Sequence, residues 1–141
     1  MGFRVQAIDP VLWNIALLRG AAWKAEHRGQ LLALRAAASD APDVITGGGR
    51  SWSPWAAKEE PAVRAVRLDD LLREEPGHML LKVDVEGDEL AVLRGAAGLL
   101  VKRQVRAVLI EVHCWILRGR GIDPWEPLAL LQEHGFLIEV R

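Results

Sequence analysis

The sequence predicts an α/β fold built around a mostly parallel sheet, and three observations lead to this prediction. Short runs rich in Val, Ile and Leu alternate along the 141 residues with segments whose apolar residues recur at helical spacing. Two of the expected helices begin with an Asp-Pro pair, at residues 9–10 and 123–124, which is a helix start signal. No internal repeat or linker divides the chain. Strands that alternate with helices are typical of βαβ units, so we expect one domain over residues 1–141.

The first expected elements form such a βαβ unit. The segment "FRVQAID" (3–9) has the composition of a short strand. Apolar residues then recur at helical spacing up to the charged stretch "KAEHRG" (24–29), which ends the helix. The segment "QLLALRAA" (30–37) predicts the second strand.

The middle of the chain is the least regular part. Prolines and a glycine triplet punctuate residues 41–61, which predicts a long excursion with a short strand at 44–46. Residues 62–68 alternate apolar and charged side chains, the pattern of an exposed or edge strand. The segment "DDLLREEPG" (69–77) predicts one short helix that a proline ends.

The remaining expected elements continue the alternation of strands and helices. Residues 79–85 and 105–113 have the composition of buried strands, and 136–140 predicts a last strand. A helix is expected over 123–135, after its Asp-Pro start signal. The helix that follows residue 85 has one apolar face, made of Leu90, Leu93, Ala97 and Leu100.

Composition and charge argue against several classes of partner. The net charge is −1, so the chain lacks the basic field that binds nucleic acid or an anionic membrane surface. Its apolar runs are shorter than the roughly 20 residues of a membrane helix, and no signal sequence opens it. The single Cys114 fits a reducing compartment. We therefore expect a cytoplasmic protein with neither a nucleic-acid nor a membrane partner.

Charged side chains gather where two of the expected strands end. Alternation along 79–85 places Lys82, Asp84 and Glu86 on one strand face. The strand at 105–113 repeats this design with Glu111 and His113. In an open parallel sheet, ligands bind beyond the carboxyl ends of the strands. If the two strands are neighbours, these side chains meet at such an edge.

Each of these residues also has a structural explanation. Lys82 is expected to pair with Glu111 or Asp84, because buried charges are normally paired. Asp88 and Glu89 would then only complement a helix N-terminus. A lone histidine such as His113 is often simply a hydrogen-bonded residue. The spacing matches no recognised metal motif, so no metal site is expected.

The segments that carry these charges resemble a known family. The stretch "LLKVDVEGDELAVLRGA" (80–96), followed by "VLIEVH" (108–113), resembles the signature of the FkbM family of S-adenosylmethionine-dependent methyltransferases. Upstream, "VQAIDP" (5–10), "LRAAASD" (34–40) and "VRLDDLL" (66–72) extend the resemblance over nearly the whole chain. The resemblance implies a Rossmann-like class I methyltransferase sheet, mostly parallel, with the cofactor S-adenosyl-L-methionine across its strand ends.

The resemblance also implies residues that bind the cofactor. Asp9 would accept hydrogen bonds from the ribose hydroxyls, although the family usually has Glu there and Asp9 could equally be a helix N-cap. Ser39 and Asp40 would lie beside the adenine, although Asp40 could equally form a turn. Asp84 would lie near the methionine end of the cofactor and the substrate pocket.

The activity that the resemblance implies is O-methylation of a hydroxyl on a sugar or secondary metabolite. Asp84, Glu86, Glu111 and His113 are the candidate catalytic residues, of which the last three would orient or deprotonate the acceptor hydroxyl. Tryptophans could stack on a sugar, although they are also ordinary core residues: Trp52, Trp55, Trp115 and Trp125.

The family's first strand and its glycine-rich turn have no counterpart in the sequence. We therefore expect an incomplete sheet and a partial, N-terminally truncated methyltransferase domain. It would be a fragment that also lacks the strand that the family has after the position of Arg141. Two hypotheses follow: most of an active enzyme, or a catalytically inactive remnant that serves in docking or assembly. The remnant would form a homo-oligomer or take a strand from a partner. A metal-dependent hydrolase that uses the same carboxylates is a weaker third idea.

Overall fold

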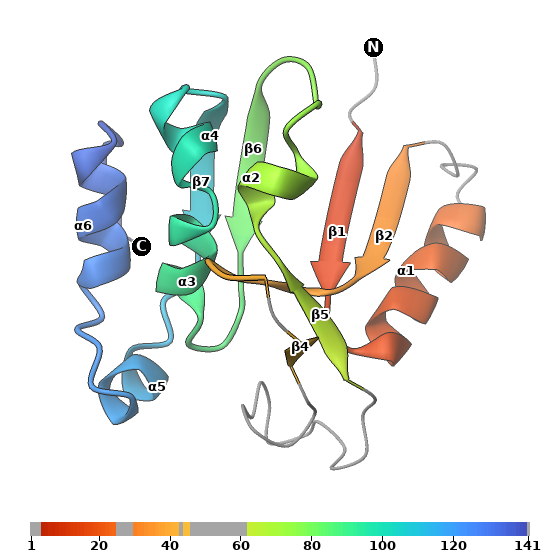
Figure 1. The fold of residues 1–141 in the computed structure, drawn as a ribbon, viewed down its shortest axis with the longest axis horizontal. Helices are drawn as coiled ribbons and strands as arrows, with labels where there is room; N and C mark the ends of the chain where they lie inside the picture. Colours follow the sequence, from red (N-terminus) through yellow and green to blue (C-terminus); the bar gives the residue numbers. More distant parts are fainter. Residues whose placement is uncertain (1–3, 25–29, 43, 46–61, 141) are drawn as a thin grey trace. The chain divides into compact units, whose positions relative to one another are not determined.

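The computed structural model describes residues 4–24, 30–42, 44–45 and 62–140. The chain divides into two compact units, Met1–Ala38 with Pro42–Ala65, and Ser39–Ala41 with Val66–Arg141. Figure 1 shows the elements of each unit. The expectation of a single domain stays a prediction. No helix of the described ranges is long and apolar enough to cross a bilayer.

The first unit contains the predicted βαβ motif. Strand β1 (Val5–Asp9) pairs in parallel with β2 (Leu31–Arg35), and helix α1 (Leu12–Lys24) connects them. Ile15 of α1 is 1% exposed, because α1 packs against β2. The parallel pairing that the alternation of strand and helix predicted is therefore confirmed for this unit.

A small sheet follows, in the order β3 (Ala37–Ala38), β5 (Val63–Val66) and β4 (Val44–Ile45). The short strand expected at 44–46 is thus confirmed, and it pairs with β5 in the antiparallel sense. Residues 62–68 were expected to form an exposed or an edge strand, and the edge alternative was wrong, because β5 lies in the middle of its sheet. Its alternation reflects burial of one strand face only, with Val63 and Ala65 buried and the residue between them exposed.

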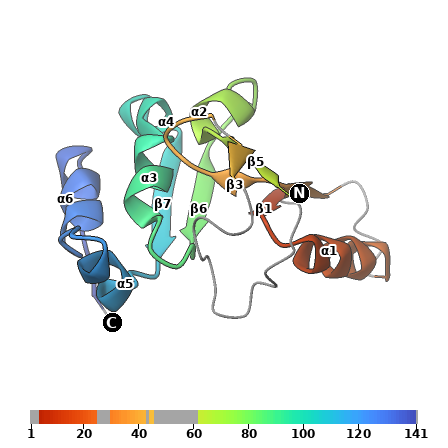
Figure 2. The same ribbon diagram turned by 60° about the horizontal axis from the view of Figure 1, so that its bottom comes forward.

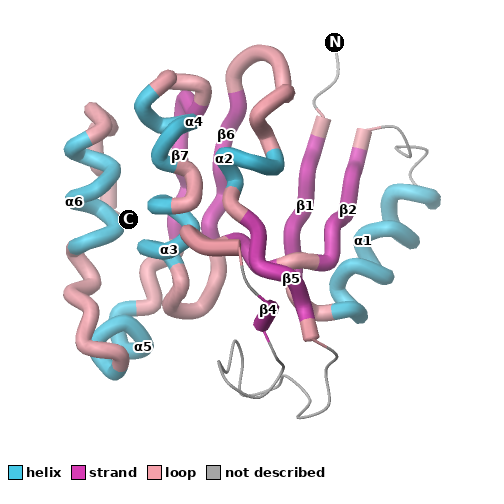
Figure 3. Tube along the Cα trace, in the orientation of Figure 1, coloured by secondary structure: helices cyan, strands magenta, loops and turns pink. Residues whose placement is uncertain are grey.

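The second unit is built on two parallel neighbouring strands, β6 (Met79–Val83) and β7 (Val105–Ile110). Their connection was expected to be one helix, but it forms α3 (Glu89–Arg94) and α4 (Ala97–Val101). The break lies at Gly95, where the backbone of Ser39 approaches so closely that a Cβ would overlap its carbonyl oxygen. Figure 3 shows the break between the two helices.

Both strands end earlier than expected, and one face of their sheet is exposed. The structure ends them at Val83 and Ile110 instead of at 85 and 113. Val83 and Val105 are buried, whereas Leu80 is 72% and Leu109 is 67% exposed. Among the described residues, the two strands that were expected to be buried are therefore covered on one face only. The candidate site residues Asp84, Glu86, Glu111 and His113 lie in the loops just after the strand ends.

Three further helices complete the second unit. Helix α2 (Leu68–Leu71) is the short helix expected after residue 68, and α6 (Glu126–Glu133) lies within the helix expected at 123–135. Helix α5 (Cys114–Gly119) was not expected. Figure 2 shows α6 beside α3, against which it packs.

The last strand, expected at 136–140, does not form. The apolar composition of this segment gives it strand propensity, but a strand also needs a hydrogen-bonded neighbour. The structure assigns these residues to no strand ladder.

Candidate functional site

Lys82 and Asp84 form an ion pair at the end of β6. The Lys82 Nζ atom lies 2.9 Å from Asp84 Oδ2, and both side chains are substantially exposed. The hydrogen bond to Asp84 raises the pKa of Lys82 above its ordinary value of 10.5, and the charges of Asp84 and Glu111 act in the same direction. The predicted structural pairing of Lys82 is therefore confirmed, with Asp84 as its partner.

Glu89 forms the most buried polar contact of the site. Its side chain is 0% exposed, and its Oε1 atom accepts hydrogen bonds from the backbone N–H groups of Gly87 and His113, each at 3.1 Å. The same oxygen lies 2.7 Å from His113 Nδ1. Glu89 Oε2 has no hydrogen-bond partner among the described residues. One carboxylate oxygen thus joins the turn after β6 to the segment after β7.

These contacts determine how the His113 ring is presented. A carboxylate only accepts hydrogen bonds, so we assign the proton of the neutral ring to Nδ1, which leaves a lone pair on Nε2. Nε2 lies 3.8 Å from Glu111 Oε1, and the His113 side chain is 18% exposed. His113 and Glu111 therefore meet as expected, with the unprotonated nitrogen beside the Glu111 carboxylate.

The sequence prediction for Glu89 was too limited. It expected Glu89 only to complement the N-terminus of a helix, and Glu89 is indeed the first residue of α3. His113, which Glu89 contacts, is 24 residues further along the chain, so the local spacing of residues could not reveal this contact. The available signal was a charged residue directly beside the apolar face of an expected helix.

The turn between β6 and α3 holds Glu86 in an unusual conformation. Glu86 has a φ of +46° and Gly87 a φ of +100°, both in the left-handed region. That region costs a non-glycine residue roughly 1 kcal/mol. Arg120 braces the turn by donating to the Gly87 carbonyl at 2.8 Å and to Asp88 Oδ1 at 3.0 Å. The Glu86 carboxylate makes no side-chain hydrogen bond within the described ranges.

Asp9, in the first unit, acts as a helix cap. Its Oδ1 atom accepts the Val11 N–H at 2.7 Å, and its Oδ2 atom accepts the Asn14 amide at 2.9 Å. The N-cap alternative is therefore realised at the start of α1. Each oxygen keeps a second lone pair, and the ribose-binding role of Asp9 stays a prediction.

Ser39 and Asp40 adjoin each other in the second unit. Ser39 is buried, and its backbone N–H donates to the Val66 carbonyl at 2.9 Å. Its hydroxyl donates to Asp40 Oδ1 at 3.3 Å, and Asp40 itself is exposed. The exposed carboxylate is accessible to a ligand, but its place beside an adenine stays a prediction.

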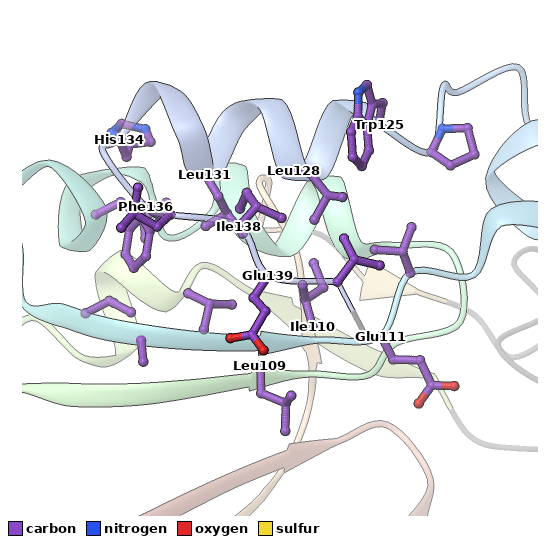
Figure 4. Close-up of a pocket in the computed structure, with 18 of the residues that line it drawn as sticks. Leu109, Ile110, Glu111, Trp125, Leu128, Leu131, His134, Phe136, Ile138 and Glu139 are labelled. Atoms are coloured by element: carbon purple, nitrogen blue, oxygen red, sulfur yellow. The ribbon is translucent and has the colours of Figure 1, made fainter.

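A groove with a volume of about 1050 Å³ lies between β7, α6 and segment 136–140. Figure 4 shows Ile138 and Glu139 on opposite sides of that segment, with Ile138 toward Leu131 of α6. Glu111 is the one candidate catalytic residue that lines the groove. The groove therefore reaches the end of β7, whereas His113 and Asp84 do not line it.

Comparisons with known proteins agree with the resemblance that the sequence motifs carry. The family model described as "Methyltransferase FkbM domain" matches residues 31–138. The hexuronic acid methyltransferase AglP of Haloferax volcanii is 34% identical over 80 residues, which are 55% of this chain and 30% of AglP.

A solved structure shows the same fold. The crystal structure of methyltransferase FkbM from Methylobacillus flagellatus aligns with a TM-score of 0.62 and 17% identity over 93% of this chain and 29% of that one. This likeness confirms the predicted Rossmann-like α/β fold. The chain spans less than a third of the length of either relative.

Proposed function

Because the chain belongs to the FkbM methyltransferase family, we propose that it serves S-adenosylmethionine-dependent methyl transfer to a hydroxyl group, with a sugar as the acceptor. The observation that carries the chemistry is the environment of the His113 ring. Its Nδ1 atom contacts the Glu89 carboxylate, and its Nε2 atom lies 3.8 Å from Glu111 Oε1. The name of AglP, a hexuronic acid methyltransferase, supports a sugar acceptor. The alternative of a catalytically inactive remnant gains no support from these matches.

The proposed cofactor residues have the chemistry that such a ligand needs. S-adenosylmethionine supplies an activated methyl group on a sulfonium. Its ribose hydroxyls and its ammonium group are hydrogen-bond donors, which carboxylate oxygens accept. Asp40 and Asp84 are exposed carboxylates, and Asp9 is half-buried. We assign Asp9 to the ribose, Ser39 and Asp40 to the adenine, and Asp84 to the methionine end.

The acceptor hydroxyl needs a base and alignment. The bound sulfonium would supply the methyl group, with its sulfur as the leaving group, and a base of the chain would take up the proton of the acceptor hydroxyl. His113 Nε2 is the base we assign, because its lone pair is free of the Glu89 contact. Glu111 and Glu86 would orient the acceptor by accepting from its other hydroxyls. A positioned base of this kind typically contributes 10²–10⁴-fold to the rate.

An exposed aromatic residue lies next to this group in the chain. Trp115 is 73% exposed at the start of α5, two residues after His113. An indole ring offers an apolar face for the C–H side of a sugar ring, while the sugar hydroxyls turn toward polar groups. Trp115 is therefore our candidate for sugar stacking, whereas Trp52 and Trp55 lie outside the described residues.

Transfer of a labelled methyl group tests the proposal. The chain is incubated with labelled S-adenosylmethionine and hexuronic acids or neutral sugars, and the product is degraded to locate the methyl group. We expect label on a sugar oxygen and a loss of roughly 10²–10⁴-fold in kcat for His113→Asn. Asp70→Asn, which changes an exposed carboxylate of α2 that pairs with Arg73, is the matched control. Equal transfer by the His113 variant would contradict the assignment of the base.

A further inference from the structure

Glu89 is a fully buried carboxylate that contacts the proposed base, and its effect on the reaction has not yet been assigned. We propose that Glu89 is a positioning residue for methyl transfer: it holds His113 with the proton on Nδ1 and stabilises the ring when Nε2 takes up the acceptor proton. This inference rests on the proposed function. It adds a residue that would act on the reaction without touching the substrate.

Burial is the first argument. Glu89 is 0% exposed, and a carboxylate in such a place is costly unless its charge has a use. Glu89 accepts hydrogen bonds from two backbone N–H groups, and the neutral amide oxygen of a glutamine could accept the same two bonds. The negative charge also complements the N-terminus of α3, but among the contacts of Glu89 with described residues, the ring nitrogen at 2.7 Å is the group that can become positively charged.

The uneven use of the two oxygens is the second argument. Oε1 accepts three hydrogen bonds, whereas Oε2 has no partner among the described residues. With a neutral ring, the charge of Glu89 is therefore only partly compensated. A proton on Nε2 makes the contact an ion pair, so the carboxylate favours the state that follows deprotonation of the acceptor. Preorganised groups of this kind stabilise charge without moving during the reaction.

Asp69 shows what a purely structural carboxylate looks like in the same unit. Its two oxygens accept hydrogen bonds from the backbone N–H groups of Gly98, at 3.0 Å, and Leu99, at 2.9 Å. Asp69 also forms an ion pair with Arg67. Each of its oxygens thus has a partner, and it makes no contact with an imidazole. Asp69→Asn is therefore the matched control for the loss of a charge that joins two segments.

The first test measures the ring directly and requires no turnover. Nitrogen-15 NMR of the labelled chain reports which ring nitrogen of His113 carries the proton in the neutral state. We expect Nδ1 to be protonated and Nε2 to be unprotonated, in the wild type and in Glu89→Gln, whose amide oxygen keeps the three contacts. A proton on Nε2 in the wild type would overturn the proposal, whatever the protein's activity.

The second test separates charge from hydrogen bonding. Glu89→Gln should lower kcat for methyl transfer by about 100-fold, at the lower end of the contribution of a general base, and leave KM for the acceptor and cofactor affinity unchanged. In a His113→Asn background the same change should cause no further loss, because Glu89 acts through the ring. Asp69→Asn should leave kcat of the folded protein unchanged.

The outcomes distinguish the inference from the function beneath it. Full activity of Glu89→Gln, beside a His113→Asn variant that has lost it, would leave Glu89 a structural residue and the proposed function intact. An Nδ1-protonated ring in a chain that transfers no methyl group to any hydroxyl would overturn both. If Glu89→Gln does not fold, the NMR result for the wild type still decides whether the ring is held as proposed.

Discussion

Gly95 lies at the point where the connection between β6 and β7 breaks into two helices, and its replacement by alanine tests the packing there. Its φ of −68° suits any residue, so backbone strain has no part in the outcome. Alanine would favour the folded chain by about 0.4–1 kcal/mol through the unfolded state. The added Cβ, however, would overlap the backbone carbonyl of Ser39, which cannot rotate away.

The expected result is a net loss of stability. Overpacking of this kind costs typically 1–3 kcal/mol, so Gly95→Ala should lower the free energy of unfolding by roughly 1–2 kcal/mol. Gly119→Ala is the matched control, because Gly119 lies in α5 with no atom within 4 Å of an added Cβ, and its φ is not positive. It should gain up to about 1 kcal/mol.

Urea denaturation followed by circular dichroism gives both free energies. The reasoning fails if Gly95→Ala is as stable as the wild type or as Gly119→Ala, because Ser39 would then not pack against the helix break. The comparison also bears on function, since Ser39 is a candidate residue for the adenine.

Three further predictions follow from single contacts. Asp84→Asn should bring the pKa of Lys82 down toward 10.5, which NMR titration of the lysine would measure. Because Asp84 raises this pKa in the folded chain, the ion pair stabilises the fold below pH 10.5. This stabilisation is lost as the pH rises through the folded-state pKa of Lys82. A Lys82 titration that is unchanged in this variant would refute that pairing. Asp69→Asn should lower the free energy of unfolding by about 1–3 kcal/mol in urea denaturation, because its amide nitrogen cannot accept a hydrogen bond from an N–H group of α4. Stability equal to that of the wild type would speak against a stabilising role of these two hydrogen bonds. Trp115→Ala should raise KM for a sugar acceptor several-fold in the methyl-transfer assay while Trp13→Ala, which removes another exposed indole, leaves it unchanged. Equal KM values for the two variants would argue against stacking at Trp115.

The sequence predicted the two strands of the second unit and the ion pair of Lys82 better than it predicted the residues at which these strands end. The residue pattern identified the two strands before Asp84 and Glu111. Their parallel pairing followed from the helical connection between them, and the structure confirms it. The strand ends were placed too late, since the charged residues continue the alternation after the ladder stops. The pairing of Lys82 was predicted from the cost of burying an unpaired charge, and the pair forms although both of its side chains are substantially exposed.

Other features depend on contacts that no local pattern contains. The break at Gly95 arises from the backbone of Ser39, more than fifty residues earlier in the chain. The contact of Glu89 with His113 joins residues that are 24 positions apart, with a helical connection and a strand between them. Segment 136–140 has the composition of a strand, but composition does not supply a neighbouring ladder.

Calorimetric titration of S-adenosylmethionine into the purified chain tests the central claim most directly. The account predicts saturable binding that Asp84→Ala abolishes and that Asp70→Ala leaves intact. Asp70→Ala makes the same change in another exposed ion pair, between Asp70 of α2 and Arg73. Absence of heat from the wild-type chain, or equal binding by the Asp84 variant, would contradict the assignment of the end of β6 to the cofactor.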